Sequence, residues 1–341
     1  MLLLLYELKK TLLSPLLLGF LVLCIALNVV ITFSYNVPDY DWSDAEPRNV
    51  FVNYDASELA DYYVRLHNMS GSAEANIRTK YVRLQLVINE KAENGDALST
   101  YLGGSTYYMH SLLFGTLLFA VIAESCLIAL FAALLSTGYE NTYNTEQIIC
   151  ASKTGRRILH TKLMATVVTG FAAFTVILGV ALVVFFIRFD FSAVWHDNVS
   201  SSFNFAPGEW PEPFMTWHSF TVAGLLLAVI VAAMGLTAVF SLFGFVLGTF
   251  FHSSYVSCGI AVALCILQYV VSFIPQVGGT LCGVINLTPI MLWANSGKWF
   301  TDGGATIAWA NFESVGVIAQ LIILSAAGLL AATLYRRREL L

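Results

Sequence analysis

Charged residues are scarce in this chain. They make up 11% of its 341 residues while hydrophobic residues reach 57%, whereas a typical soluble domain carries about 25% charge. A water-exposed surface needs more charge than this, so the composition excludes an ordinary soluble protein. The charges stand between apolar runs of roughly 20 residues, the length that crosses about 30 Å of hydrocarbon as a helix. Unbroken runs such as 166–187 exclude a β-barrel, whose strands alternate in polarity. The predicted fold class is therefore an all-α polytopic membrane protein.

The chain also lacks the motifs that mark many membrane enzymes and pumps. It has no Gly-x-x-x-x-Gly-Lys-Ser/Thr loop to cradle a nucleotide, and neither His-Glu-x-x-His nor Gly-x-Ser-x-Gly. The six histidines are scattered, and the six cysteines fall in or beside apolar runs without the paired spacing of a metal site or disulfide framework. Basic residues form no stripe interleaved with aromatics, so nucleic acid is not an expected partner. We expect no catalytic residue, metal or cofactor on this chain.

Six apolar runs are long enough to span a bilayer. We place them at residues 15–36, 110–137, 162–187, 219–249, 255–274 and 311–335. The segments on the side of residue 1, down to the tail 336–341, hold nine basic and four acidic residues, whereas the opposite side holds eight basic and seventeen acidic ones. By the positive-inside rule, both termini are expected in the cytoplasm.

Several segments carry patterns of their own. Residues 1–14 predict an amphipathic helix at the inner interface, and Pro15 suits the first turn of the next helix. Residues 275–310 predict short extracellular or re-entrant helices, because glycines and prolines interrupt them. Gly244 and Gly248 form a Gly-x-x-x-Gly pair, which favours close helix packing against another helix of this chain or a second subunit.

The loop after the first span, residues 37–109, is long and acidic. Apolar residues recur at helical spacing between 56 and 93 with a break at 70–72, which predicts an extracellular helical hairpin. This hairpin either forms a substrate lid or packs on itself or on the second extracellular loop, 188–218.

Glu124 is the one ionisable residue in the middle of a predicted span. An ionisable side chain at that depth costs about 2.5–3.5 kcal/mol on insertion scales. It therefore needs a partner or a cavity, and Asn28 and Gln268 are the candidate partners from other spans. A protonated Glu124 hydrogen-bonded between helices is one interpretation, and a role in a substrate pathway or gate is the other.

The cytoplasmic segment 138–161 joins the second and third spans. Its middle predicts a short helix that carries Ile148 and Ile149 on one apolar side and ends near Gly155. The segment resembles its counterpart in the permease subunits of type-two ABC exporters, where a Glu, a Gly-Thr four residues on, a short helix, a Pro-x-Ser-Arg turn and a Lys follow in order. The corresponding residues here are Glu140, Thr145, Arg156 and Lys162, the Lys one residue early, with Asn144 in place of the Gly and Lys153 in place of the Pro.

The resemblance extends to the inner-interface helix, the six spans and the broken extracellular helices, and so covers nearly the whole chain. It implies a half-transporter that pairs with a second permease subunit, as a homodimer or heterodimer. It also implies a separate ATPase subunit that binds ATP and Mg²⁺. The implied coupling residues are Glu140, Thr145, Glu146, Ile148, Ile149, Arg156, Arg157 and Lys162. The two arginines would pair with carboxylates of the ATPase or with lipid phosphates.

We therefore expect the permease subunit of a bacterial cell-membrane exporter that moves an amphipathic peptide, antibiotic or lipid-like molecule outward. The chain itself would not be an enzyme. Two alternatives stay open: a nontransporting sensor or scaffold whose extracellular hairpin binds a ligand, and an intramembrane enzyme that uses Glu124. In either case, segment 138–161 would be a solvated loop with positive-inside charges.

Overall fold

The structure is a computed structural model that describes residues 2–37, 49, 51–96, 105–145, 148, 155, 158–190, 192, 194–199, 214–251 and 253–337. Over these residues the chain is helical and has two isolated β-bridges but no longer strand. Six helices among them are long and apolar enough to cross a membrane: Pro15–Ser34, Tyr107–Thr142, Ile158–Arg188, Val222–Phe251, Ser254–Val271 and Phe312–Tyr335. The predicted all-helical class is confirmed, and the six helices are candidates for the six predicted spans.

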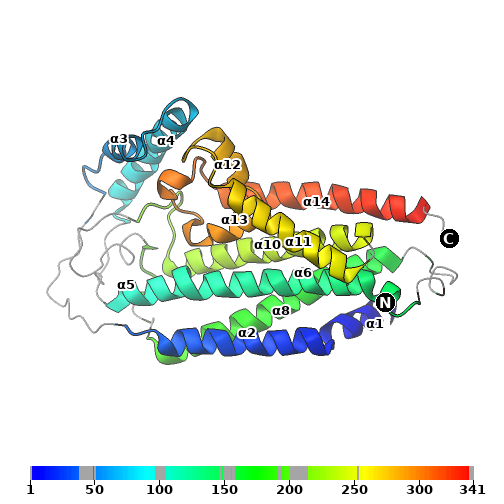
Figure 1. Cartoon of the computed structure of the whole chain (residues 1–341). Coiled ribbons are helices and arrows are strands. Elements are labelled where there is room, and N and C mark those ends of the chain that lie inside the picture. Colours follow the sequence, from blue (N-terminus) through cyan, green and yellow to red (C-terminus); the bar gives the residue numbers. More distant parts are fainter. Residues whose placement is uncertain are drawn as a thin grey trace.

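The spans form one elongated bundle with both chain termini at the same end (Figure 1). We call this the terminal end and the opposite one the hairpin end. Helix α6 (Leu118–Thr142) packs against both α8 (Ile158–Arg188) and α10 (Val222–Phe251), and α14 (Phe312–Arg337) packs against α10.

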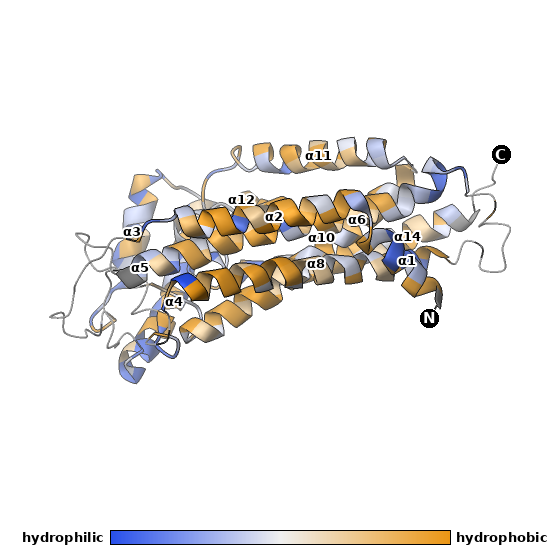
Figure 2. Cartoon of the chain, turned by 90° about the horizontal axis from the view of Figure 1, so that it is seen from below, coloured by the Kyte–Doolittle hydropathy of each residue, from blue (hydrophilic) through white to orange (hydrophobic). Residues whose placement is uncertain are grey.

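Two further spans lie on the outside of this core. α2 (Pro15–Ser34) packs against α8 and α6. α11 (Ser254–Val271) lies to one side of the bundle in Figure 2, and Ser257 and Ala261 are its only buried residues. Hydrophobic residues extend along the length of the bundle in the same view, and many of the large ones are exposed. An apolar exterior of this kind suits helices that face lipid.

Two spans are longer than their apolar runs predict. The second span continues without a break from α5 (Ser105–His110) through the π-helix η1 (Ser111–Leu117) into α6. α8 begins at Ile158, so Lys162 lies one turn inside the helix rather than at its start. A lysine is tolerated there because its charge is neutralised locally, as described below.

Gly244 and Gly248 pack against α6 of the same chain. A Cβ at Gly244 would approach the carbonyl oxygen of Leu130 to 2.8 Å, and one at Gly248 would collide with the Thr137 hydroxyl. Both glycines are therefore needed for the close approach of α10 to α6. Of the two partners that the sequence leaves open, another helix of this chain or a second subunit, the structure shows the first.

The first helix, α1 (Leu2–Leu12), is separate from α2 and is joined to it by Leu13 and Ser14. Pro15 stands at the start of α2, where its missing N–H leaves no intrahelical bond unmade. Between α11 and α14 the chain forms short helices: α12 (Thr280–Asn286), α13 (Pro289–Ala294), η3 (Ser296–Lys298) and η4 (Gly304–Thr306).

The hairpin end carries α3 (Ala56–Leu66) and α4 (Ser72–Asn94), which pack on each other (Figure 1). The Asp55 side chain caps α3 by accepting from the Ser57 amide at 2.8 Å. The buried apolar side of the hairpin forms a core of its own, to which Met215, Trp217 and Ala305 from other segments contribute.

Two buried lysines of α4 attach the hairpin to the rest of the protein. The Lys80 ammonium donates to the carbonyl oxygens of Asp302 at 3.0 Å, Gly304 at 2.6 Å and Ile307 at 2.9 Å. Lys91 donates to the Thr216 hydroxyl at 3.1 Å and to the His218 carbonyl at 3.2 Å. These bonds favour a packed hairpin over the alternative of a substrate lid.

Candidate functional site

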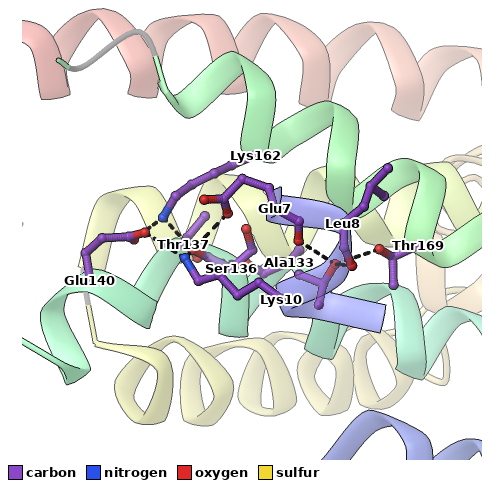
Figure 3. Close-up of polar contacts among 10 residues, drawn as sticks. Glu7, Leu8, Lys10, Ala133, Ser136, Thr137, Glu140, Lys162 and Thr169 are labelled. Atoms are coloured by element: carbon purple, nitrogen blue, oxygen red, sulfur yellow. Dashed lines mark hydrogen bonds and ion pairs between the residues drawn. The ribbon is translucent and has the colours of Figure 1, made fainter. Parts of the chain in front are cut away.

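Four charged side chains meet in the interior of the terminal end (Figure 3). Glu7 and Lys10 come from α1, Glu140 from the end of α6 and Lys162 from the start of α8. The Lys10 ammonium lies 2.8 Å from Glu140 Oε1 and 3.5 Å from Glu7 Oε2. Lys162 pairs with the other oxygen of Glu140, so this carboxylate bridges two lysines. We call these four residues the ionic cluster.

The ionic cluster is almost fully shielded from solvent, which makes its pairing energetically important. The exposed side-chain fractions are 2% for Glu7, 10% for Lys10, 8% for Glu140 and 3% for Lys162. Its two positive and two negative charges balance, and each buried ion needs such a partner to offset its desolvation. Lys162 also donates to the Ser136 carbonyl at 2.6 Å, and Lys10 lies 3.6 Å from the centre of the Tyr139 ring.

α1 is packed into the bundle rather than only resting at an interface. Glu7 and Thr11 are buried, and the Thr11 hydroxyl lies 2.9 Å from that of Thr169 on α8. In the sequence, Glu7 and Lys10 count only among the charges on the side of residue 1, and no partner is predicted for either. The signal available was a Glu and a Lys three residues apart in a leucine-rich helix, an arrangement that places both on one side.

Helix α6 ends in a defined C-terminal motif. We call residues 143–157, which join α6 to α8, the connecting segment. The Thr145 amide donates to the Glu140 carbonyl at 2.9 Å, the Asn144 amide to the Asn141 carbonyl at 3.3 Å, and Asn144 has a φ of 55°. This is a Schellman motif, whose left-handed position usually holds glycine and next most often asparagine. Asn144 is the residue that the sequence comparison places at the glycine of the resembled motif.

The other predicted coupling residues are less fully described. Ile148 is helical and 71% exposed. Glu146, Ile149, Arg156 and Arg157 lie outside the described residues, as does most of the predicted short helix. The structure therefore brings Glu140 and Lys162 together, one at each end of the connecting segment, and places Thr145 next to Glu140 through the backbone.

The polar groups predicted inside the spans separate into two places. Asn28 donates through Nδ2 to Glu124 Oε2 at 2.6 Å and to the Cys24 carbonyl at 3.1 Å. Gln268 does not join them, since its Oε1 accepts from the Ile290 amide at 3.3 Å. Glu124 Oε1 has no hydrogen-bond partner among the described residues. The Asn28–Glu124 pair therefore joins α2 to α6 near the middle of the bundle.

Among the described residues, no group of three or more His, Cys, Asp or Glu side chains lies close enough to hold a metal ion. The ionic cluster is internally paired, so its acids and bases are engaged with one another. Such a cluster is suited to joining helices.

Six long apolar helices that pack into one core are compatible with the class of multi-pass helical membrane proteins. Comparison with protein-family models, with curated proteins and with solved structures finds no match for this chain. A narrower function is therefore inferred from the chain's own residues and their geometry.

Proposed function

We propose that this chain is the permease subunit of an ATP-driven ABC exporter, working with a second permease subunit and a separate ATPase that binds ATP and Mg²⁺. The observation that carries the proposal is the ionic cluster. Glu140 and Lys162 stand at the two ends of the connecting segment between α6 and α8, and Lys10 joins their pair to α1. A force on this segment would be transmitted to α1, α6 and α8 together.

The mechanical logic depends on the buried bonds of the terminal end. The ionic cluster joins α1, α6 and α8, and the Thr11–Thr169 contact adds a second bond between α1 and α8. α1 continues into α2 after two residues. An ATPase that moved the connecting segment would therefore shift α2, α6 and α8 as a unit. Packed helices of this kind can switch between two arrangements.

The conformation of the connecting segment also supports the resemblance. Asn144 has the left-handed conformation expected at the family's glycine position, and the exposed Ile148 offers an apolar side chain for a partner to cover. The substrate class follows from the resemblance alone: an amphipathic peptide, antibiotic or lipid-like molecule moved outward across a bacterial cell membrane.

In the proposed orientation, the terminal end is cytoplasmic and the hairpin end extracellular. We expect Cys introduced for exposed Ser72, in α4, to react with a membrane-impermeant maleimide on intact cells. Cys introduced for exposed Asn141, at the end of α6, should react only after permeabilisation. The parent chain serves as the control for labelling of the native cysteines. The reverse pattern of labelling would overturn the proposed orientation.

The coupling proposal is tested by changing Ile148 and Ile149 to Asp together. Docking would desolvate two carboxylates without partners, and one such burial already costs several kcal/mol. We expect the ATPase that copurifies with the parent chain to fall by at least about ten-fold, with loss of substrate-stimulated ATP hydrolysis.

The matched control is Leu86→Asp in α4, because Leu86 is 70% exposed and lies at the opposite end of the bundle. It should leave copurification unchanged at equal membrane abundance. If the Ile148→Asp, Ile149→Asp chain also retained its ATPase and its stimulated hydrolysis, the connecting segment would be a solvated loop, and the sensor or scaffold alternative would become the better account.

A further inference from the structure

A cavity of about 480 Å³ lies at the terminal end, next to the ionic cluster, with which it shares Lys10. The end of α6 forms one part of its wall, the junction of α1 and α2 a second, and Ser254 at the start of α11 a third. The volume is within the range of roughly 300–1,000 Å³ that small-molecule sites occupy. Because α2, α6 and α11 are candidate spans and meet here at their ends, the cavity lies where the bundle would leave the bilayer.

One cation at this cavity is not used by the ionic cluster. Lys9 and Lys10 both line the cavity, but Lys10 is paired with Glu140 and Glu7. Lys9 is exposed and forms no ion pair among the described residues. No carboxylate of the described residues lines the cavity, since those of Glu7 and Glu140 are buried in the ionic cluster. The cavity therefore has an uncompensated positive charge, which attracts an anion.

One hydroxyl of the lining is available to a ligand. Ser14 lines the cavity and is partly exposed, and its side chain makes no capping bond to α2. The other serine and threonine hydroxyls are not available: those of Thr11, Thr142 and Ser254 donate to backbone carbonyls, and that of Ser136 is fully buried. The Ser14 hydroxyl and the Lys9 ammonium can both donate to the oxygens of one anionic group, such as a phosphate.

Tyrosine rings surround the cavity. Tyr6, Tyr139 and Tyr143 line it, and Tyr255 at the adjacent start of α11 is 87% exposed. The ring of Tyr139 already lies beneath the Lys10 ammonium, whereas Tyr6 and Tyr143 are 67% and 61% exposed. Tyrosines gather at the headgroup level of a bilayer, because the ring is apolar and the hydroxyl is polar. Their position therefore places the cavity at the depth of lipid phosphates.

We propose that this cavity binds the phosphate headgroup of an anionic phospholipid from the leaflet at the terminal end. Lys9 pairs with the phosphate, and the Ser14 hydroxyl donates to one of its oxygens. A lipid is favoured over a free phosphate ion because Leu13 and Leu16, at the α1–α2 junction, are 57% and 63% exposed and would contact its acyl chains. The site requires the bundle to lie in a membrane but requires no ATPase, so it is independent of the exporter function.

Native mass spectrometry of the full chain in mild detergent measures this binding, because each bound lipid adds a defined mass. We expect the chain to bind the first phosphatidylglycerol at least about five-fold more tightly than phosphatidylcholine, whose headgroup has no net charge. This is the effect of one lysine near an anionic lipid. Lys9→Gln should remove the preference by weakening phosphatidylglycerol binding about five-fold, with phosphatidylcholine binding unchanged.

The matched control combines Lys9→Gln with Leu3→Lys, which restores the charge of α1 at a 36% exposed residue that does not line the cavity. Phosphatidylglycerol binding should stay weak in this double variant. Lys9→Gln should fold normally, since it changes an exposed side chain without an ion pair, and an unchanged thermal midpoint in phosphatidylcholine would confirm this.

Three results would overturn the proposed site. Equal binding of the two lipids by the parent chain would show that the cavity has no preference for an anionic headgroup. Recovery of phosphatidylglycerol binding in the Leu3→Lys double variant would assign the preference to the general charge of α1. Displacement of the lipid by an equal concentration of glycerol 3-phosphate would show that the cavity binds a soluble phosphate and that the acyl chains contribute nothing.

Discussion

Replacing Glu140 with Ala is expected to lower the free energy of unfolding by about 3–5 kcal/mol, the usual loss when one partner of a buried ion pair is removed. The reason is that Glu140 bridges Lys10 and Lys162. Without Glu140, the two buried lysines share one carboxylate, that of Glu7. The hydrogen bond that Lys162 keeps is the one to the Ser136 carbonyl. Denaturant unfolding of the purified chain in mild detergent measures the loss.

A double variant separates the ionic origin of this effect from simple loss of packing. Glu140→Leu combined with Lys162→Met removes one charge of each sign and leaves the Glu7–Lys10 pair intact. Because a buried pair replaced by apolar residues of similar volume is often tolerated, most of the lost stability should return. If the double variant is no more stable than Glu140→Ala, the charges of the cluster do not determine its stability.

The number of spans was predictable because it depends on composition over about 20 residues, which needs no tertiary information. The ends of the helices were harder to predict. Lys162 marks a span boundary in the sequence because lysine is unfavourable in hydrocarbon, yet α8 begins one turn earlier. The buried partner Glu140 makes that lysine acceptable within the helix, and this pairing arises only when α6 and α8 pack.

The candidate site was only partly predictable, because it also depends on how the helices pack. Glu140 and Lys162 were identified from the resemblance, whereas Glu7 was missed because its burial depends on α1 packing against distant helices. Both Asn28 and Gln268 were reasonable partners for Glu124, since each is a polar residue within a span. The choice between them depends on how each helix is rotated about its axis, and hydropathy does not specify that rotation when apolar residues occur all round.

The burial of Ser296 had no signal in the sequence. A serine in a segment broken by glycine and proline is an ordinary loop residue, and only the folded chain shows that its hydroxyl is buried without a hydrogen-bond partner among the described residues. Absence of a partner is a property of the assembled structure. Pattern reasoning locates polar groups where they are rare, as with Glu124, but not where they are common.

Lys80→Met is expected to loosen the attachment of the α3–α4 hairpin by at least about 2 kcal/mol at neutral pH. The change leaves three carbonyl oxygens without their lysine donor, and each lost bond to a charged group is worth roughly 1.5–3 kcal/mol. Relief of the buried charge offsets only part of this loss. Hydrogen-exchange protection factors of the α4 amides measure the attachment, and Arg83→Met on the exposed side of α4 should change them little.

The attachment should also strengthen as the pH rises. Burial lowers the pKa of the Lys80 ammonium from 10.5 to about 8, with Lys298 nearby lowering it further and Asp302 opposing the shift. Below pH 8 the attached and detached hairpins both carry the proton, so the penalty of the buried charge is fully present. Between pH 8 and 10.5 the attached form releases its proton while the detached form retains it, and linkage then favours attachment.

The expected order of α4 protection is therefore Lys80→Met lowest, the parent chain at pH 7 higher and the parent chain at pH 9.5 highest. A neutral amine still donates two hydrogen bonds, whereas the Met side chain donates none. Protection factors are already corrected for the chemical exchange rate at each pH, and Lys80→Met should lose the rise between pH 7 and 9.5. Protection that is greater in Lys80→Met than in the parent at pH 7 would mean that the desolvation of the charge outweighs its three hydrogen bonds, and Lys80 would then not be an anchor of the hairpin.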